Sequence, residues 1–128
     1  MAEILLVEPD RRLASTYAKA LQAAGHHVTA VPSAQTAIMA ADAVLPDLVI
    51  LELQLVEHSG IEFLYEFRSY PDWQAVPIII QSQVPPAEFS DNWQLLQDEL
   101  GVQAYLYKPR TSLRRLLAQV QEFTPVKT

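Results

Sequence analysis

The chain of 128 residues contains no cysteine. Disulfide bonds, thiolate metal sites and cysteine nucleophiles are therefore excluded, and a reducing compartment is permitted, so we expect a cytoplasmic protein. No apolar stretch approaches the roughly 18 to 20 residues that cross a bilayer, and we expect no contact with a membrane. Met1 leads within a few residues into a strand-like run with no basic segment before it, which predicts that there is no signal peptide.

Basic residues and glycine are also scarce. Nine Lys and Arg against fifteen Asp and Glu give a formal net charge of -6, which argues against a nucleic-acid binder that must neutralise phosphates. Only three Gly are present, too few for the loops that cradle a phosphate or a flavin. A flavodoxin-like small-ligand binding protein or enzyme is therefore the least favoured function. The histidines show no metal-ligand spacing, so no metal site is assigned to them.

Apolar runs alternate with stretches of helical periodicity along the whole chain. The runs without polar alternation are typical of parallel strands that are covered on both faces. Strands are predicted at 4–7, 27–31, 48–53, 76–80 and 104–107. Helices are predicted at 11–24, 34–43, 61–69, 87–100 and, after a cap at Thr111 or Ser112, up to residue 123.

This alternation predicts an α/β fold. We expect a doubly wound five-stranded parallel sheet of the flavodoxin-like order 2-1-3-4-5. One domain is expected over residues 1–124, followed by a frayed tail over 125–128.

A single acid, Glu52, comes at the carboxyl end of the third predicted strand. Ligands of open α/β sheets bind at this edge. The order 2-1-3-4-5 puts the first and third strands side by side, so Glu8 and Glu52 are expected to be neighbours. Asp10 is a second candidate for this acidic pocket, although it is equally suited to cap the first helix. Glu52 could also be an ordinary solvated acid at a strand end.

Five segments in order identify a family resemblance. They are Ile4-Leu5-Leu6-Val7 before acids, Pro46-Asp47-Leu48-Val49-Ile50-Leu51 before an acid, Gly60 eight residues after that acid, Pro77-Ile78-Ile79-Ile80 before a hydroxyl residue, and Tyr105-Leu106-Tyr107-Lys108-Pro109. Over nearly its whole length the chain resembles the response-regulator receiver domain (CheY-like) of two-component signalling. The resemblance implies the same fold.

The resemblance also implies roles for particular positions. Receivers accept a phosphoryl group on an Asp, and that position is Glu52 in this chain. They hold magnesium with two acids after the first strand, and those positions are Glu8 and Pro9. The switch residues of the family correspond to Ser82 and Tyr105, and its lysine corresponds to Lys108.

Two of these positions depart from the family pattern in ways that matter chemically. The carboxylate of Glu projects about 1.5 Å further than that of Asp, and phosphoryl transfer depends on positioning. Pro9 offers no side-chain oxygen, which weakens magnesium binding, although Asp10 could help to hold a metal. We therefore expect an atypical receiver with no catalytic residue and no cofactor, in which Glu52 pairs with Lys108 as a permanent mimic of the activated state.

The expected function is that of a stand-alone protein interaction module and not of an enzyme. Its partner would be another protein, such as a histidine kinase or an output protein. A homodimer could form through the fourth helix, fifth strand and fifth helix, the face that receivers often use to pair. The alternative is a receiver that still accepts a phosphoryl group with a divalent metal.

Overall fold

The structure, a computed structural model, describes residues 2–56 and 59–124. Its strands are β1 (Glu3–Val7), β2 (His27–Val31), β3 (Leu48–Leu51), β4 (Ile78–Ser82) and β5 (Val102–Tyr107). Its α-helices are α1 (Arg11–Ala23), α2 (Ala34–Ala43), α3 (Gly60–Ser69), α4 (Trp93–Asp98) and α5 (Leu113–Phe123). Three 3-10 helices are η1 (Pro71–Trp73), η2 (Pro86–Asn92) and η3 (Lys108–Arg110). None of the helices in these ranges is long and apolar enough to cross a membrane.

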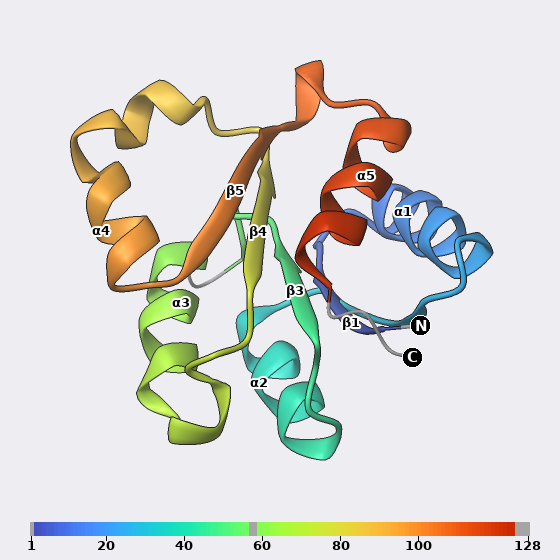
Figure 1. Cartoon of the computed structure of the whole chain (residues 1–128), viewed down its shortest axis with the longest axis horizontal. Coiled ribbons are helices and arrows are strands. Elements are labelled where there is room, and N and C mark those ends of the chain that lie inside the picture. Colours follow the sequence, from blue (N-terminus) through green and yellow to red (C-terminus); the bar gives the residue numbers. More distant parts are fainter. Residues whose placement is uncertain (1, 57–58, 125–128) are drawn as a thin grey trace.

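The strands form one parallel sheet in the order β2-β1-β3-β4-β5. This confirms the predicted doubly wound sheet of order 2-1-3-4-5. Figure 1 shows α1 and α5 on one side of the sheet and α2, α3 and α4 on the other. The carboxyl ends of all five strands therefore lie at one edge, which is the upper end of the sheet in Figure 1. The predicted tail over 125–128 lies outside the described residues.

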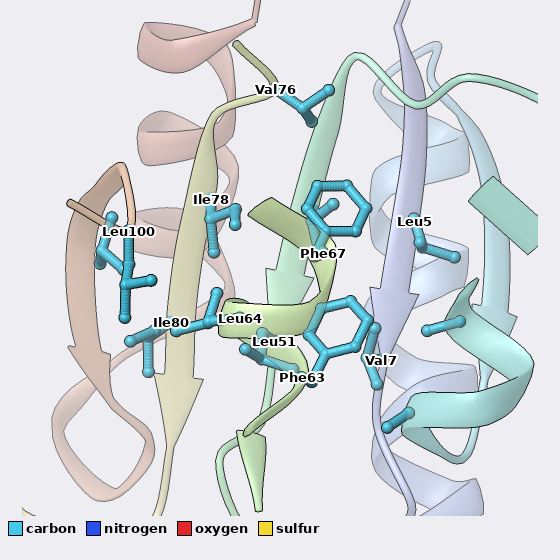
Figure 2. Packing of buried hydrophobic residues seen from close by; sticks show 14 of the residues in the cluster. Leu5, Val7, Leu51, Phe63, Leu64, Phe67, Val76, Ile78, Ile80 and Leu100 are labelled. Carbon is cyan, nitrogen blue, oxygen red and sulfur yellow. The ribbon is translucent and has the colours of Figure 1, made fainter. Parts of the chain in front are cut away.

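Each central strand sends alternate side chains into two separate cores. Towards α2 and α3, residues such as Leu5, Val49 and Ile80 pack with buried residues of those helices. Figure 2 shows Phe63, Leu64 and Phe67 of α3 lying over this face. Towards α1 and α5, residues such as Ile4, Ile50 and Ile79 pack with a second buried cluster that contains Tyr17, Leu21, Leu116 and Val120. Because both faces of β1, β3 and β4 are covered, these strands carry apolar runs without alternation.

The prediction of one helix over 87–100 is wrong. The segment forms the 3-10 helix η2 up to Asn92, and only Trp93–Asp98 is α-helical. Polar residues that compete for backbone hydrogen bonds occupy its middle, and the hydroxyl of Ser90 donates to the carbonyl oxygen of Ala87 at 3.1 Å. The interruption leaves Phe89 and Trp93 only partly buried against the core.

Four strands also differ from their predicted bounds, and the first of them, β1, begins at Glu3 rather than at residue 4. β3 ends at Leu51, so Glu52 lies just beyond it, although the Glu52 amide still donates to the Val7 carbonyl at 3.0 Å. β4 begins after Pro77, which has no N–H to donate, and runs on to Ser82. β5 begins at Val102 rather than at residue 104, with a register shift against β4 between Ile78 and Ile79.

Gly60 begins α3 in direct contact with the end of β3. A Cβ atom at this position would lie 2.6 Å from the Leu53 Cα atom and 3.1 Å from the Glu52 carbonyl oxygen. Gly60→Ala is therefore expected to lower the free energy of unfolding by about 1–3 kcal/mol, because backbone must move to admit the methyl group. Urea unfolding measures the loss. Leu53→Ala added to this variant should not restore stability, since the clash with the Cα atom remains, and a loss below about 0.5 kcal/mol would contradict the close contact.

Candidate functional site

Four polar side chains meet at the carboxyl edge of the sheet. Glu8 follows β1, Glu52 follows β3, Ser82 is the last residue of β4 and Lys108 follows β5. Each strand ends at the same edge because the sheet is parallel, and the strand order places β1, β3 and β4 next to one another. The fold therefore assembles this group from residues that are far apart in the sequence.

Lys108 bridges the two acids. Its Nζ atom lies 2.5 Å from Oε1 of Glu8 and 2.7 Å from Oε1 of Glu52. The side chain of Lys108 is 7% exposed, and those of both acids are 3% exposed. Carboxylates buried to this degree require a paired cation or several hydrogen-bond donors, and Lys108 supplies one charge for two acids.

The remaining oxygens of both carboxylates also accept hydrogen bonds. Oε2 of Glu52 accepts from the Ser82 hydroxyl and from the Gln54 amide at 3.0 Å. Oε1 of Glu52 accepts from the Gln83 amide at 3.2 Å in addition to Lys108. Oε2 of Glu8 accepts from the Asp10 amide at 3.1 Å. Every carboxylate oxygen of this pair therefore has a donor within the protein.

The hydrogen bonds decide the charge state of the site. Burial alone would raise the pKa of Glu52, but hydrogen bonds from Lys108, Ser82 and the Gln54 amide outweigh it and hold the pKa below its ordinary value. Burial would likewise lower the pKa of Lys108, but its bonds to Glu52 and Glu8 raise that pKa above the ordinary value. Glu52 is therefore ionised and Lys108 protonated around neutral pH.

The depressed pKa of Glu52 predicts a loss of stability in acid. Its contribution is fully present above the pKa of an unfolded Glu, about 4.3, and is lost as the pH falls through the lower folded value. We expect stability to decline below about pH 4.3, by at most about 1.4 kcal/mol per pH unit for this one group. Urea unfolding at a series of pH values measures the slope. Glu52→Gln should flatten it, whereas Glu66→Gln on the exposed side of α3 should leave it unchanged.

A hydrogen-bonded path leads from Glu52 to the surface. The Ser82 hydroxyl, which donates to Glu52, accepts from the Val84 amide at 3.0 Å. The Tyr105 hydroxyl donates to the Val84 carbonyl oxygen at 2.6 Å, and burial raises the pKa of Tyr105 to about 12.

The Tyr105 ring lies near the rings of Phe89 and Trp93, with centroid distances of 6.1 Å and 6.4 Å. These three rings line a hollow of about 310 Å³.

Asp10 is placed at the start of α1. Its carboxylate caps the helix by accepting from the amides of Arg12 at 2.9 Å and Leu13 at 3.1 Å. The residue is exposed, and only its backbone N–H reaches the pocket, through Glu8. The sequence left two roles open for Asp10, as a helix cap and as part of the acidic pocket. In the structure its side chain acts as the helix cap.

The residues at this edge do not fit a magnesium ion. Magnesium requires near-octahedral oxygen ligands at short distance, but the oxygens of Glu8 and Glu52 already contact an ammonium group and backbone or hydroxyl donors. Pro9 offers no side-chain ligand. Within residues 2–56 and 59–124, no group of three or more His, Cys, Asp and Glu could hold a metal ion.

Sequence reasoning missed part of this site. It did not foresee that Lys108 contacts Glu8 as well as Glu52, nor that the amides of Gln54 and Gln83 hold the Glu52 carboxylate. The expected adjacency of Glu8 and Glu52 could have predicted that Lys108 contacts both acids. The amide contacts could not be predicted in this way, because a backbone N–H is present whatever the side chain is.

Comparisons with known proteins agree in sequence and in fold. The sequence profile described as "Response regulator receiver domain" matches residues 4–121. The chain is 34% identical over 109 residues to the KDP operon transcriptional regulatory protein KdpE of Escherichia coli (strain K12), covering 85% of this chain and 45% of that protein. It is 30% identical over 121 residues to the sensory transduction protein RegX3 of Mycobacterium bovis, covering 94% and 50%. The chain thus spans about half the length of these curated relatives.

Solved structures show the same architecture. The chemotaxis response regulator CheY4 of Vibrio cholerae superposes with a TM-score of 0.83 at 22% identity, covering 96% of this chain and 98% of that one. The BeF3-activated N-terminal receiver domain of RstA from Klebsiella pneumoniae gives a TM-score of 0.78 at 26% identity, covering 94% and 97%.

Proposed function

The chain belongs to the response regulator receiver domain family of two-component signalling, and we propose that it is an atypical receiver in which Glu52 is a permanent charge and not a phosphoryl acceptor. The observation that carries the proposal is the bridge of Lys108 between Glu8 and Glu52. This buried cation occupies the space between the two acids. The domain signals by contact with another protein.

The contacts of Glu52 oppose phosphoryl transfer. Attack on a phosphorus atom requires a carboxylate oxygen that is accessible and aligned with the leaving group. Both oxygens of Glu52 instead accept two hydrogen bonds each, and the side chain is 3% exposed. Displacing these donors would leave Lys108 and Ser82 without their partner in a buried site, at a cost that a weakly bound phosphoryl donor does not offset.

The same contacts support a fixed signalling state. A carboxylate that reaches Ser82 and Lys108 places a negative charge where an activated receiver carries its modified acid. Ser82 in turn holds the Val84 amide, and Tyr105 holds the Val84 carbonyl oxygen. Glu52 therefore biases the segment after β4 and the Tyr105 side chain towards one arrangement without any covalent change.

The partner surface in this proposal is the face made by α4, β5 and α5. Tyr105 connects this face to Glu52, and the hollow beside it is lined by Pro86, Phe89 and Trp93. Exposed charges on or next to these elements, among them Asp98, Glu99 and Arg110, would contribute specificity more than strength. The occupant is a histidine kinase, an output protein or a second copy of the domain. A cytoplasmic location and independence from an output domain stay predictions.

Two substitutions at Glu52 test the fixed-charge proposal. Glu52→Gln removes the charge, and Glu52→Asp withdraws it by about 1.5 Å. We expect both variants to bind the partner at least about tenfold more weakly, which corresponds to about 1.4 kcal/mol. The measurement is titration calorimetry with a protein captured by the unsubstituted domain. Per-residue NMR gives a second readout, since the amides of Gln83, Val84 and Tyr105 should shift in both variants.

The controls separate charge from folding. Glu66→Gln, on the exposed side of α3, should leave binding and these amide signals unchanged. If the unsubstituted chain, Glu52→Gln and Glu52→Asp all bind the partner equally well, the proposal is wrong.

A further inference from the structure

A second hollowed surface lies at the opposite edge of the sheet, where β3 and β4 begin. It consists of two adjoining hollows of about 560 Å³ and about 360 Å³, which share Leu45 and Asp72 in their walls. One continues to the end of α5 at Phe123, and the other continues between α2 and η1. This edge is at the lower end of the sheet in Figure 1, away from Glu52.

Large apolar side chains are exposed on this surface. Leu45, which lines both hollows, is 57% exposed, and Tyr70, which lines one of them, is 41% exposed. Val76 and Trp73, which are buried, form part of the walls. Large apolar side chains that gather on an exposed, hollowed surface mark an interaction site more often than isolated ones do.

The charged residues that line these hollows within the described part of the chain are all acidic. Asp42, Asp47, Asp72 and Glu122 line them, and neither hollow has a Lys or Arg among its described lining residues. Arg68 approaches this region from α3, but its guanidinium donates to the carbonyl oxygens of Trp73 at 2.6 Å, Leu100 at 2.9 Å and Gly101 at 3.3 Å. Asp47 accepts a hydrogen bond from the Glu3 amide at 2.8 Å and is set aside. Asp42, Asp72 and Glu122 have no Lys or Arg facing them from the described walls.

We propose that this surface binds a basic segment of a partner protein, one that inserts an apolar side chain beside Leu45 and places Lys or Arg against Asp42, Asp72 and Glu122. The negative charge of the rim favours a basic partner segment over the other possible occupants. A second copy of this acidic chain, a nucleic acid or an anionic membrane would each bring negative charge to a negative rim. The proposal is independent of the state of Glu52, because the surface lies at the other edge of the sheet.

The test uses the whole chain and defined probes. A pool of short synthetic peptides composed of Lys, Arg, Leu, Val and Phe is titrated into isotope-labelled protein and followed by per-residue NMR. A matched pool has Glu in place of Lys and Arg. We expect the basic pool alone to shift the amides of Asp42, Leu45, Tyr70 and Gln103, and added salt should weaken its binding.

Variants at the rim and at the anchor complete the test. Asp42→Lys combined with Asp72→Lys should weaken binding of the basic pool about tenfold, and Leu45→Ser should weaken it to a similar extent. Glu88→Lys, an equal charge reversal at the other edge of the sheet, should have no effect. All of these positions are exposed, and the melting temperature of each variant checks that it folds.

Three results would overturn the proposal. The first is absence of binding by the basic pool, or equal binding by the acidic pool. The second is a set of shifted amides centred on Tyr105 instead of Leu45. The third is a dimer in sedimentation velocity that disappears in Leu45→Ser, since the occupant would then be a second copy of the chain.

Discussion

Lys108→Met is expected to lower the free energy of unfolding by about 3–5 kcal/mol. The substitution keeps the length of the side chain but removes the charge that Glu8 and Glu52 share, at Nζ distances of 2.5 Å and 2.7 Å. Two carboxylates that are 3% exposed would then face each other without a cation. Chemical unfolding in urea at neutral pH measures the loss, and few single changes in this domain should cost more.

Matched variants separate this effect from loss of packing. Lys19→Met, on the exposed part of α1, should change stability by less than about 0.5 kcal/mol. In a Glu52→Gln background, Lys108→Met should cost at least about 1 kcal/mol less than in the unsubstituted chain, because only one buried carboxylate remains to be compensated. A loss below about 1 kcal/mol for Lys108→Met alone would mean that the bridge is not a buried ion pair.

The double substitution Pro9→Asp, Glu52→Asp is expected to create a phosphoryl acceptor where the unsubstituted chain has none. Glu52→Asp withdraws the carboxylate by about 1.5 Å from Ser82 and Lys108 and frees an oxygen. Pro9→Asp supplies a second carboxylate beside Glu8, giving a hard cation the oxygen ligands that it requires. The reaction should depend on magnesium. It is measured as a gain of one phosphoryl group by intact-protein mass spectrometry with a small acyl phosphate donor.

Each single variant is a control for the double variant. Pro9→Asp alone leaves Glu52 bonded to Ser82 and Lys108, and Glu52→Asp alone lacks the second ligand, so we expect at least about tenfold less adduct from either. Pro9→Asn with Glu52→Asp matches the double variant in size but has one charge fewer. Phosphorylation of the Pro9→Asp single variant at Glu52 would show that the length of this side chain is not the obstacle.

The fold could be predicted from the sequence because its two cores impose a simple pattern. Runs such as 48–51 and 78–80 are apolar at every position since both faces of the sheet are covered. Short connections between such runs and helical segments favour right-handed crossovers between parallel strands, and this leads to a doubly wound sheet. The positions of Glu52, Ser82 and Lys108 at strand ends then follow from the parallel order of the sheet.

The segment between β4 and β5 shows where sequence patterning fails. Phe89, Trp93, Leu96 and Leu100 have helical spacing, yet residues 86–92 form a 3-10 helix. The spacing indicates which side chains face the core. Over a short segment, an α-helix and a 3-10 helix can both place side chains of this spacing on one face. The polar stretch in the middle of the segment favours the 3-10 form, and the Ser90 hydroxyl bonds to the nearby Ala87 carbonyl oxygen.

The inner contacts of the site were out of reach for a different reason. That Lys108 reaches Glu8 and Glu52 at once depends on how the turn at η3 aims its side chain after β5. The amides of Gln54 and Gln83 bond to Glu52 because of the local path of two loops. Neither feature is encoded in residue type or spacing, so the sequence could not predict that the carboxylate is fully hydrogen-bonded.

The central claim is that Glu52 is a fixed charge held by Lys108 and Ser82 and does not accept a phosphoryl group. The most direct measurement is intact-protein mass spectrometry of the unsubstituted chain after incubation with a small acyl phosphate and magnesium, with the Pro9→Asp, Glu52→Asp variant as the positive control. We predict no adduct on the unsubstituted chain under conditions that modify the variant. A magnesium-dependent phosphoryl adduct located on Glu52 would contradict it.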